Sequence, residues 1–493
     1  MRRRIALIII VILWIALFSY NVMAITDNAE IIDLNNSNTD VAMSELSPKQ
    51  SDKELTPKLL VKCNGKELIE GQDYTVKYKK RAKKDIKNGS LGPRIIIKGK
   101  GLYKKALEYS YELDRTNIYV SANGNDQATG DIYHPLKTVQ RALYATRPGS
   151  TVWLKEGIYK GNNIFTQSGS EADGYITIRP FENEEVTLTN KKGKKGAIFS
   201  TEGNSYIKIQ KLKIANMKAK DVYGVLMLGG ESHIYIEDCE FSNIATSKPG
   251  SKKRPGGNAN AILLLGEGEN KDQSINNIYI TGNKVHDNVN GWSENISIAG
   301  NCENIYVYNN EVFNNTNIGI DFYGNAEYCN SKEFDQPRNC ECIGNTVYNC
   351  KSFYAENAGI YVDGARDILV SGNSVYKNSY GIEIGSEEWR DFYDENNQVK
   401  NIQVIDNRIS ENSECGLRLG GFTNDETTGV VTSCLIEGNS FANNGSDNTE
   451  IILSKCNNIV FKNNSFQNGL GYESVVKYDD CIDRNKISNI LFQ

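Results

Sequence analysis

The chain has 493 residues, which is too long for one ordinary compact domain but compatible with a solenoid, where each coil contacts only its two neighbours. Its formal net charge is -5 at pH 7, with 56 Lys and Arg residues spread among 61 Asp and Glu residues. This balance gives no global basic field, so we do not expect nucleic acid as a partner.

The first segment has the pattern of an export signal. Three arginines precede an apolar run over residues 5–18, and Val-Met-Ala ending at Ala24 follows. This layout predicts a signal peptide over residues 1–24 and a secreted or cell-surface protein. An uncleaved membrane anchor is the alternative, because the run approaches the about 20 apolar residues that a membrane span needs.

Two segments separate the signal from the rest of the chain. Residues 25–56 are rich in Asn, Asp, Ser and Thr and have no apolar period, which predicts a disordered linker. Residues 57–114 contain the short alternating runs LLVKCNG, DYTVKYKK, RIIIKGKG and LEYSYEL and predict a small antiparallel β domain. The segments GQDYTVKY and IIIKGKGLYKK resemble immunoglobulin-like modules of bacterial surface proteins, and the resemblance implies a spacer or binding module.

One helix is expected after Asn117 and before Pro148-Gly149. Leu136, Val139, Ala142 and Leu143 fall on one helical face. A solenoid needs such a cap because its first coil has no neighbour to cover its end. The stretch NIYVSANGNDQATG, with PGSTVWLKEGIY after the helix, resembles the N-terminal cap of the pectate-lyase-like superfamily.

The remaining sequence repeats, as in IYITGNKV, IYVYNNEV, ILVSGNSV and IQVIDNRI. Seven asparagines share one register at spacings of one coil plus variable loops: Asn283, Asn310, Asn345, Asn373, Asn407, Asn439 and Asn464. We expect them to be structural, with side chains that hydrogen-bond from coil to coil. Residues 117–493 resemble right-handed parallel β-helix proteins. The predicted fold class is therefore all-β, a solenoid with an N-terminal capping helix, preceded by the small antiparallel domain.

Eleven cysteines are an odd number for an exported protein. Their spacing lacks the two CxxC pairs of a zinc ribbon. We expect most of them to be small buried apolar residues rather than disulfide partners or metal ligands.

Polar residues gather on four strands that begin with glycine. These strands are GIDFYG (319–324), GIYVDG (359–364), GIEIGSE (381–387) and GLRLGG (416–421). Strand alternation buries the aliphatic residues and leaves the others facing solvent. On successive coils about 4.8 Å apart, Asp321, Tyr361, Glu383 and Arg418 then form a column, with Tyr323 and Asp363 beside it. An ordinary solvated face is the alternative.

Paired carboxyl groups of this kind suit glycoside hydrolysis, which needs two of them about 5–9.5 Å apart. Asp363 with Glu383, or Asp321 with Glu383, meets that requirement, so all three are candidate catalytic residues. Tyr323, Tyr361, Glu387, Trp389 and Tyr393 are the expected substrate-binding residues, because aromatic rings can pack on sugars while charged groups hold hydroxyls. Local packing is the alternative for the loop aromatics.

The strands and the cap resemble uncharacterised exported β-helix proteins related to family 9 pectate lyases, which implies an enzyme that cleaves polysaccharides. We expect hydrolysis without a cofactor, by a monomer whose partner is a polysaccharide. The first alternative is a lyase in which Asp321, Asp363 and Glu383 hold Ca²⁺ and Arg418 is the base. The second is a non-catalytic glycan-binding surface protein or adhesin.

Overall fold

The computed structural model describes residues 32–35, 38–45, 58–91, 94–109, 113, 115–250, 255–355, 357–387, 398–420, 429–479 and 483–493. The chain divides into two compact units, Met1–Lys155 and Glu156–Gln493. The predicted signal peptide lies outside the described residues. Within them, no helix is long and apolar enough to cross a membrane.

The first unit contains the expected small antiparallel β domain. Its two three-stranded antiparallel sheets are β2 (Thr39–Glu45), β3 (Lys58–Cys63) and β4 (Lys66–Glu67), and β5 (Tyr74–Lys79), β6 (Arg94–Gly99) and β8 (Ala106–Tyr109). A short parallel pair is formed by β1 (Ile32–Asp33) and β7 (Tyr103–Lys104), and α1 spans Lys83–Lys87. Both β1 and β2 fall within the segment predicted as linker. Leu34 and Val41 are buried there, which shows that a few apolar residues suffice to join this polar segment to the core.

The cap follows in the same unit. Strands β9 (Asn117–Val120) and β10 (Thr151–Leu154) pair in parallel, and α2 (Val139–Ala145) lies between them in sequence. The Thr138 hydroxyl accepts a hydrogen bond from the Arg141 backbone N–H at 3.3 Å and caps the helix. Leu136 is buried as predicted but lies outside the helix, where it bridges to Val120.

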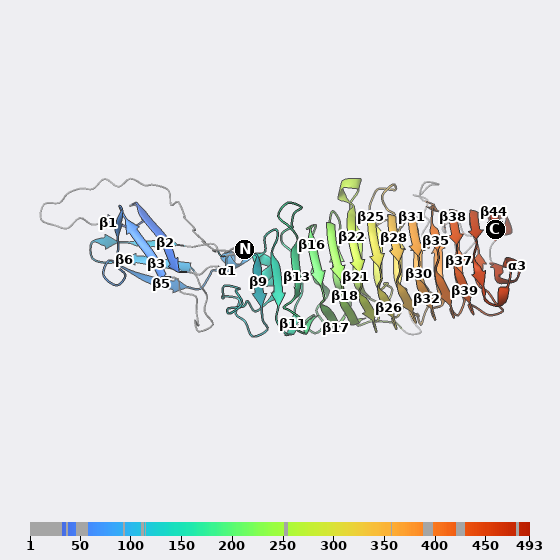
Figure 1. Ribbon diagram of the computed structural model, residues 1–493, viewed down its shortest axis with the longest axis horizontal. Helices are drawn as coiled ribbons and strands as arrows, with labels where there is room; N and C mark the ends of the chain where they lie inside the picture. Colours follow the sequence, from blue (N-terminus) through green and yellow to red (C-terminus); the bar gives the residue numbers. More distant parts are fainter. Residues whose placement is uncertain are drawn as a thin grey trace, which may run out of the picture. The chain divides into compact units, whose positions relative to one another are not determined.

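The second unit winds into a parallel β-helix of three sheets, whose strands follow one another from green to red in Figure 1. Within this unit the first sheet contains β13 (Ile176–Pro180), β16 (Ile207–Gln210), β19 (Ser232–Glu237), β22 (Ile275–Thr281), β25 (Cys302–Tyr308), β28 (Arg338–Ile343), β31 (Arg366–Ser371), β34 (Val399–Lys400), β35 (Gln403–Ile405), β38 (Val431–Glu437), β41 (Cys456–Lys462) and β44 (Ile487–Phe492).

The second sheet contains β11 (Gly157–Lys160), β14 (Val186–Thr189), β17 (Lys213–Ala219), β20 (Glu240–Thr246), β23 (Lys284–His286), β26 (Glu311–Phe313), β29 (Thr346–Tyr348), β32 (Ser374–Tyr376), β36 (Arg408–Ser410), β39 (Ser440–Ala442) and β42 (Ser465–Phe466). The third sheet contains β12 (Asn163–Ile164), β15 (Gly196–Ser200), β18 (Asp221–Met227), β21 (Asn258–Gly266), β24 (Ile296–Gly300), β27 (Ile320–Tyr323), β30 (Ala358–Asp363), β33 (Tyr380–Gly385), β37 (Cys415–Leu419), β40 (Ile451–Leu453) and β43 (Val476–Tyr478). Four short helices complete the described chain: η1 (Lys271–Gln273), η3 (Gln467–Gly469), α3 (Tyr472–Val475) and η4 (Arg484–Lys486).

The predicted asparagine ladder is confirmed. Asn373 is typical of it, because its side-chain Nδ2 donates to the Cys342 carbonyl and to Asn407 Oδ1, both at 2.9 Å. Its own Oδ1 accepts from the backbone N–H and the side chain of Asn345 at 2.8 and 3.0 Å. A second ladder that the sequence analysis missed runs at another corner through Asn288, Asn315, Asn378, Asn412 and Asn444. Both ladders satisfy buried backbone groups where the strands turn.

The interior of the helix is aliphatic. Ile320, Ile360, Ile382 and Leu417 align from coil to coil and are fully buried. The cysteines that the structure describes are all buried, and those of the solenoid are free thiols, which confirms the expectation for them. Cys481 lies outside the described residues.

Candidate active site

The structure aligns the expected polar column on the third sheet. Asp321 of β27 pairs with Tyr361 of β30, Tyr361 pairs with Glu383 of β33, and Glu383 pairs with Arg418 of β37. Beside this column, Tyr323 pairs with Asp363. Strand alternation therefore predicted correctly which residues share a side of the sheet.

The column does not face solvent, which corrects the expectation from the sequence. Asp321 and Asp363 are each 2% exposed, Tyr361 and Glu383 are each 1% exposed, and Arg418 is 6% exposed. Tyr323 is half-buried. The physical reason is that side chains from segments outside the four strands lie close to the column.

The segment between β27 and β28 is one of these. Asp335 is fully buried and accepts hydrogen bonds from the backbone N–H groups of Glu327 at 2.7 Å and Tyr328 at 3.1 Å. The turn brings the Tyr328 ring to Tyr323, with 5.5 Å between centroids. Its backbone passes close to Gly300 at the end of β24, where a Cβ atom would lie 3.0 Å from the Tyr328 Cβ.

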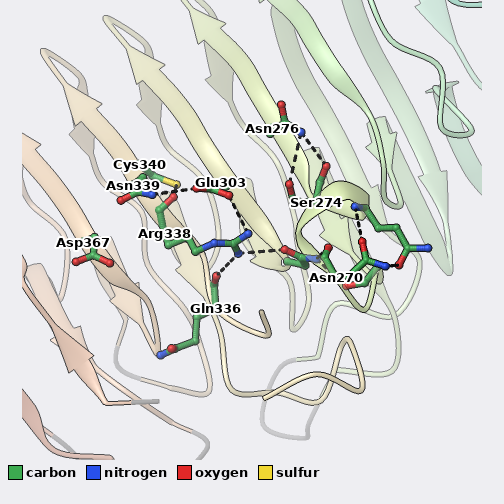
Figure 2. A network of polar contacts seen from close by, with 12 residues as sticks. Asn270, Ser274, Asn276, Glu303, Gln336, Arg338, Asn339, Cys340 and Asp367 are labelled. Atoms are coloured by element: carbon green, nitrogen blue, oxygen red, sulfur yellow. Dashed lines mark hydrogen bonds and ion pairs between the residues drawn. The ribbon is translucent and has the colours of Figure 1, made fainter. Parts of the chain in front are cut away.

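A buried ion pair anchors the end of the same segment (Figure 2). Arg338 Nη2 lies 3.0 Å from Glu303 Oε2, and Arg338 Nη1 donates to Asn301 Oδ1 at 3.0 Å. Gln336 Nε2 donates to the carbonyl of Gly364, the residue after Asp363, at 2.8 Å. These contacts tie the segment to the coils on both sides and fix the surroundings of Asp363.

Glu387 follows β33, and its backbone N–H donates to Asp363 Oδ1 at 2.8 Å. Its side chain is exposed, and its role in substrate binding stays a prediction. Trp389 and Tyr393, which were also expected to bind substrate, lie outside the described residues. The observed contact makes Glu387 a neighbour of the buried carboxyl group of Asp363.

Arg418 is the only cationic residue among the described residues of the column. Its Nε lies 3.6 Å from Glu383 Oε1, and its Nη2 donates to Asp479 Oδ2 at 2.8 Å. Burial lowers the pKa of Arg418, but the charges of Glu383, Tyr380 and Asp479 carry it above its ordinary value. Glu383 is thus a carboxylate next to a permanent cation.

The two aspartates have the opposite environment. Burial raises the pKa of Asp321 well above its ordinary value, and the charges of Glu294 and Asp363 raise it further. Burial likewise raises the pKa of Asp363, with Glu387 and Glu383 adding to the effect. Carboxyl groups in such surroundings take up a proton at higher pH than exposed ones.

Glu294 is a member of the site that the sequence analysis missed. It is half-buried just before β24, and burial raises its pKa to about 7. It hydrogen-bonds Ser297, which pairs with Asp321 on the neighbouring strand. Ser297 is the feature of the sequence that could have revealed this part of the site. Leu226, Leu263 and Ser297 align on successive strands, and Ser297 is polar where the two residues before it are apolar.

Two buried atoms of the column lack a hydrogen-bond partner among the described residues, Asp321 Oδ1 and the Tyr361 hydroxyl. Buried polar atoms are almost always satisfied, by protein, water or ligand. Both atoms therefore have an open hydrogen-bonding position that water or a bound molecule would fill.

The described residues offer no group of three or more His, Cys, Asp or Glu side chains arranged to hold a metal ion. Asp321, Asp363 and Glu383, the ligands expected for Ca²⁺ in the lyase alternative, are all described and form no such group.

Fold and sequence comparisons together define the class of this protein. Residues 196–399 match the family model "Right handed beta helix region". The chain is 23% identical over 358 residues to the pectate lyase PEL9 of Emericella nidulans, covering 68% of this chain and 80% of that protein. It is a right-handed parallel β-helix protein of the pectate-lyase-like superfamily.

The chain is also 31% identical over 338 residues to the uncharacterized protein YwoF of Bacillus subtilis (strain 168) and belongs to the same family. The alignment covers 65% of this chain and 67% of YwoF. Among solved structures, pectate lyase Pel9A is 14% identical with a TM-score of 0.41, covering 75% of this chain and 79% of that one.

Proposed function

We propose that the protein hydrolyses glycosidic bonds of an extracellular polysaccharide, with Asp363 as the general acid and Glu383 as the base or nucleophile. The observation that carries the proposal is the opposite environment of these two neighbours. Asp363 is buried next to Glu387, while Glu383 is paired with Arg418. Membership of a superfamily that includes a protein named pectate lyase supports action on a carbohydrate.

Glycoside hydrolysis requires one carboxyl group that keeps its proton and a second one that is ionised. Burial and negative neighbours raise the pKa of Asp363, so this residue can donate a proton to the leaving oxygen. The Arg418 guanidinium compensates the negative charge that Glu383 needs as base or nucleophile.

The strand register brings the two groups to a suitable spacing. Asp363 pairs with Gly385, two residues beyond Glu383 on the neighbouring strand. Strands about 4.8 Å apart and a rise of about 3.3 Å per residue put the two backbone positions about 8 Å from each other. Side chains on the same side of the sheet at these two positions can bring their carboxyl groups into the separation of about 5–9.5 Å that glycosidases use. Tyr361 Oη and Asp321 Oδ1 are the atoms that we expect to hold sugar hydroxyls.

The similarity to pectate lyase PEL9 favours a second candidate, a polysaccharide lyase. A lyase needs a cation beside the uronate carboxylate and a base that is deprotonated, so that it can accept a proton from the sugar. Arg418 is held in its charged form by Glu383 and Asp479, which suits charge compensation better than proton abstraction. Hydrolysis is therefore the preferred reaction. A non-catalytic glycan-binding protein would not require two neighbouring carboxyl groups in opposite electrostatic environments.

Incubation of the purified protein with a panel of polysaccharides tests the reaction type. We expect new reducing ends, no ultraviolet absorbance from an unsaturated product, and the same rate with and without a chelator. Unsaturated products that require added Ca²⁺ would establish the lyase instead. Binding of a glycan without any cleavage would establish the adhesin.

A further inference from the structure

An aromatic pair, of which Trp292 is exposed and Tyr354 is half-buried, lies where the chain enters the third sheet. Trp292 and Tyr354 stand four residues before β24 and β30, respectively. Their ring centroids are 5.1 Å apart, with an interplanar angle of 65°. Trp292 is 43% exposed, and Phe353, next to Tyr354, is 75% exposed. Large aromatic side chains that remain accessible together on a soluble protein mark a binding surface.

Hydrogen bonds fix this pair in place. Trp292 Nε1 donates to the Pro255 carbonyl at 3.1 Å, and Asn317 Nδ2 donates to the Trp292 carbonyl at 3.2 Å. Asn357, three residues after Tyr354, donates from Nδ2 to the Asn317 carbonyl at 3.0 Å. Asn317 therefore links the two aromatic segments, and a surface ordered in advance loses less entropy when it binds.

Glu294 connects the aromatic pair with the column. It lies two residues after Trp292, and its charge acts on both Tyr354 and Asp321. Asn260 Nδ2 donates to the Glu294 carbonyl at 2.9 Å. Asn260 is 1% exposed, and its Oδ1 has no hydrogen-bond partner among the described residues. With Asp321 and Tyr361, buried polar atoms that lack a partner among the described residues lie on β21, β27 and β30 of the third sheet.

The negative charges around the unsatisfied polar atoms favour an uncharged ligand over an anionic one. Five carboxyl groups act on one another here: Glu294, Asp321, Asp363, Glu383 and Glu387. The Arg418 cation already pairs with Glu383 and Asp479. A uronate would add a negative charge to this cluster, whereas the hydroxyl groups of a neutral sugar can donate to carboxylate oxygens.

We propose that Trp292 and Tyr354, with Glu294 and Asn260, form a subsite for an uncharged pyranose of a neutral glycan whose chain continues to Asp363 and Glu383. The subsite deepens, and rests on, the proposed hydrolase function. One ring packs against the Trp292 and Tyr354 side chains while its hydroxyls donate to Glu294 and Asn260 Oδ1. The substrate class is a neutral polysaccharide, in contrast to the polyuronate implied by the name of the lyase relative.

Calorimetric titration of the Glu383→Gln protein tests the subsite without turnover. The probes are four neutral hexasaccharides (cello-, xylo-, manno- and β-1,4-galactohexaose) and the anionic hexagalacturonate. We expect at least one neutral probe to bind and hexagalacturonate to bind about tenfold or more weakly. Added Trp292→Ala should weaken the neutral probe by about tenfold or more, which is typical of truncating a central aromatic contact.

Two further variants control for folding and for general aromatic effects. Trp292→Phe keeps a ring and should retain most of the affinity, and melting curves should show that each variant is folded. Tyr376→Ala removes a partly exposed ring that stacks on Tyr348 in the second sheet and should leave the affinity unchanged.

The outcomes separate the subsite from the catalytic proposal. A neutral probe that binds through Trp292, but that the wild-type protein never cleaves, would support the subsite and defeat the hydrolase. Cleavage of a neutral glycan with unchanged binding by Trp292→Ala would support the hydrolase and overturn the subsite. Tight binding of hexagalacturonate alone, or binding of no neutral probe at millimolar concentration, would overturn the neutral-glycan proposal.

Discussion

The carboxyl groups of Asp363 and Glu383 differ in their protonation chemistry because their neighbouring charges differ. Glu383 and Asp363 lie on adjacent strands and are equally buried, yet one contacts a guanidinium and the other a backbone N–H next to a glutamate. A buried carboxylate with a cationic partner is stabilised in its charged form, whereas one near other carboxylates is destabilised. The difference has consequences for folding as well as for catalysis.

Replacement of each residue by its amide should change stability in opposite directions at pH 7. Asp363→Asn removes the cost of keeping this buried carboxyl group protonated at pH 7, where the unfolded chain ionises it, and keeps an acceptor for the Glu387 N–H, so the free energy of unfolding should rise by about 1 kcal/mol. Glu383→Gln removes the ion pair between Glu383 and Arg418 and should lower the free energy of unfolding by about 1–3 kcal/mol. Denaturant titration measures both, and equal shifts would contradict this assignment.

Glu294 makes stability depend on pH. Its pKa is about 7 in the folded protein and near 4.5 in the unfolded chain. Between these values the folded state binds more protons, so the free energy of unfolding should fall as pH rises from about 4.5 to 7 and should level off above 7. Melting curves of the wild type and of Glu294→Gln over this range test the effect. The difference between them should grow with pH, and a constant difference would contradict the assignment.

Elements that repeat were predictable, and elements that occur once were not. The Asn373 ladder and the column containing Tyr361 followed from a period and from strand alternation. Tyr328, whose ring contacts Tyr323 beside that column, lies in an insertion without any period. Glu294 sits in a turn whose sequence resembles an ordinary surface turn. Regular spacing determines which residues share a side of a sheet, but it carries no information on what lies over that side.

The ladder should contribute more to stability at its middle than at its end. Asn373→Ala would leave the Asn345 N–H and the Cys342 carbonyl unsatisfied in a buried corner, at a cost of about 2–4 kcal/mol. Asn464 at the end of the ladder is only half-buried, so water can replace its side chain and Asn464→Ala should cost less. Denaturant titrations compare the two variants, and equal losses would show that the ladder does not act through buried hydrogen bonds.

Within the first unit, the cap forms hydrogen bonds with residues that precede it in the sequence. Arg81 donates to the Ala128 carbonyl at 2.8 Å, its backbone N–H donates to Gln127 Oε1 at 3.0 Å, and Arg141 donates to the Ser90 carbonyl. The cap therefore uses residues 81–91, which the sequence analysis assigned to the small β domain.

Truncation tests this boundary. A chain that begins at residue 80 keeps these contacts and should melt like the full-length protein. A chain that begins at residue 115 loses Arg81 and Ser90 and should melt at least about 2 °C lower. Identical melting temperatures for the two truncated chains would show that the cap is complete without residues 81–91.

The central claim is that Asp363 and Glu383 cleave the glycosidic bond, and steady-state kinetics on a polysaccharide that the wild type cleaves test it most directly. Asp363→Asn and Glu383→Gln should each lower kcat by at least about a hundredfold, the usual scale of general acid-base catalysis. Asp367→Asn, a partly exposed carboxylate paired with Arg366 in the first sheet, is the matched control and should keep full activity. Wild-type turnover by both active-site variants would contradict the account and place the reaction elsewhere on the protein.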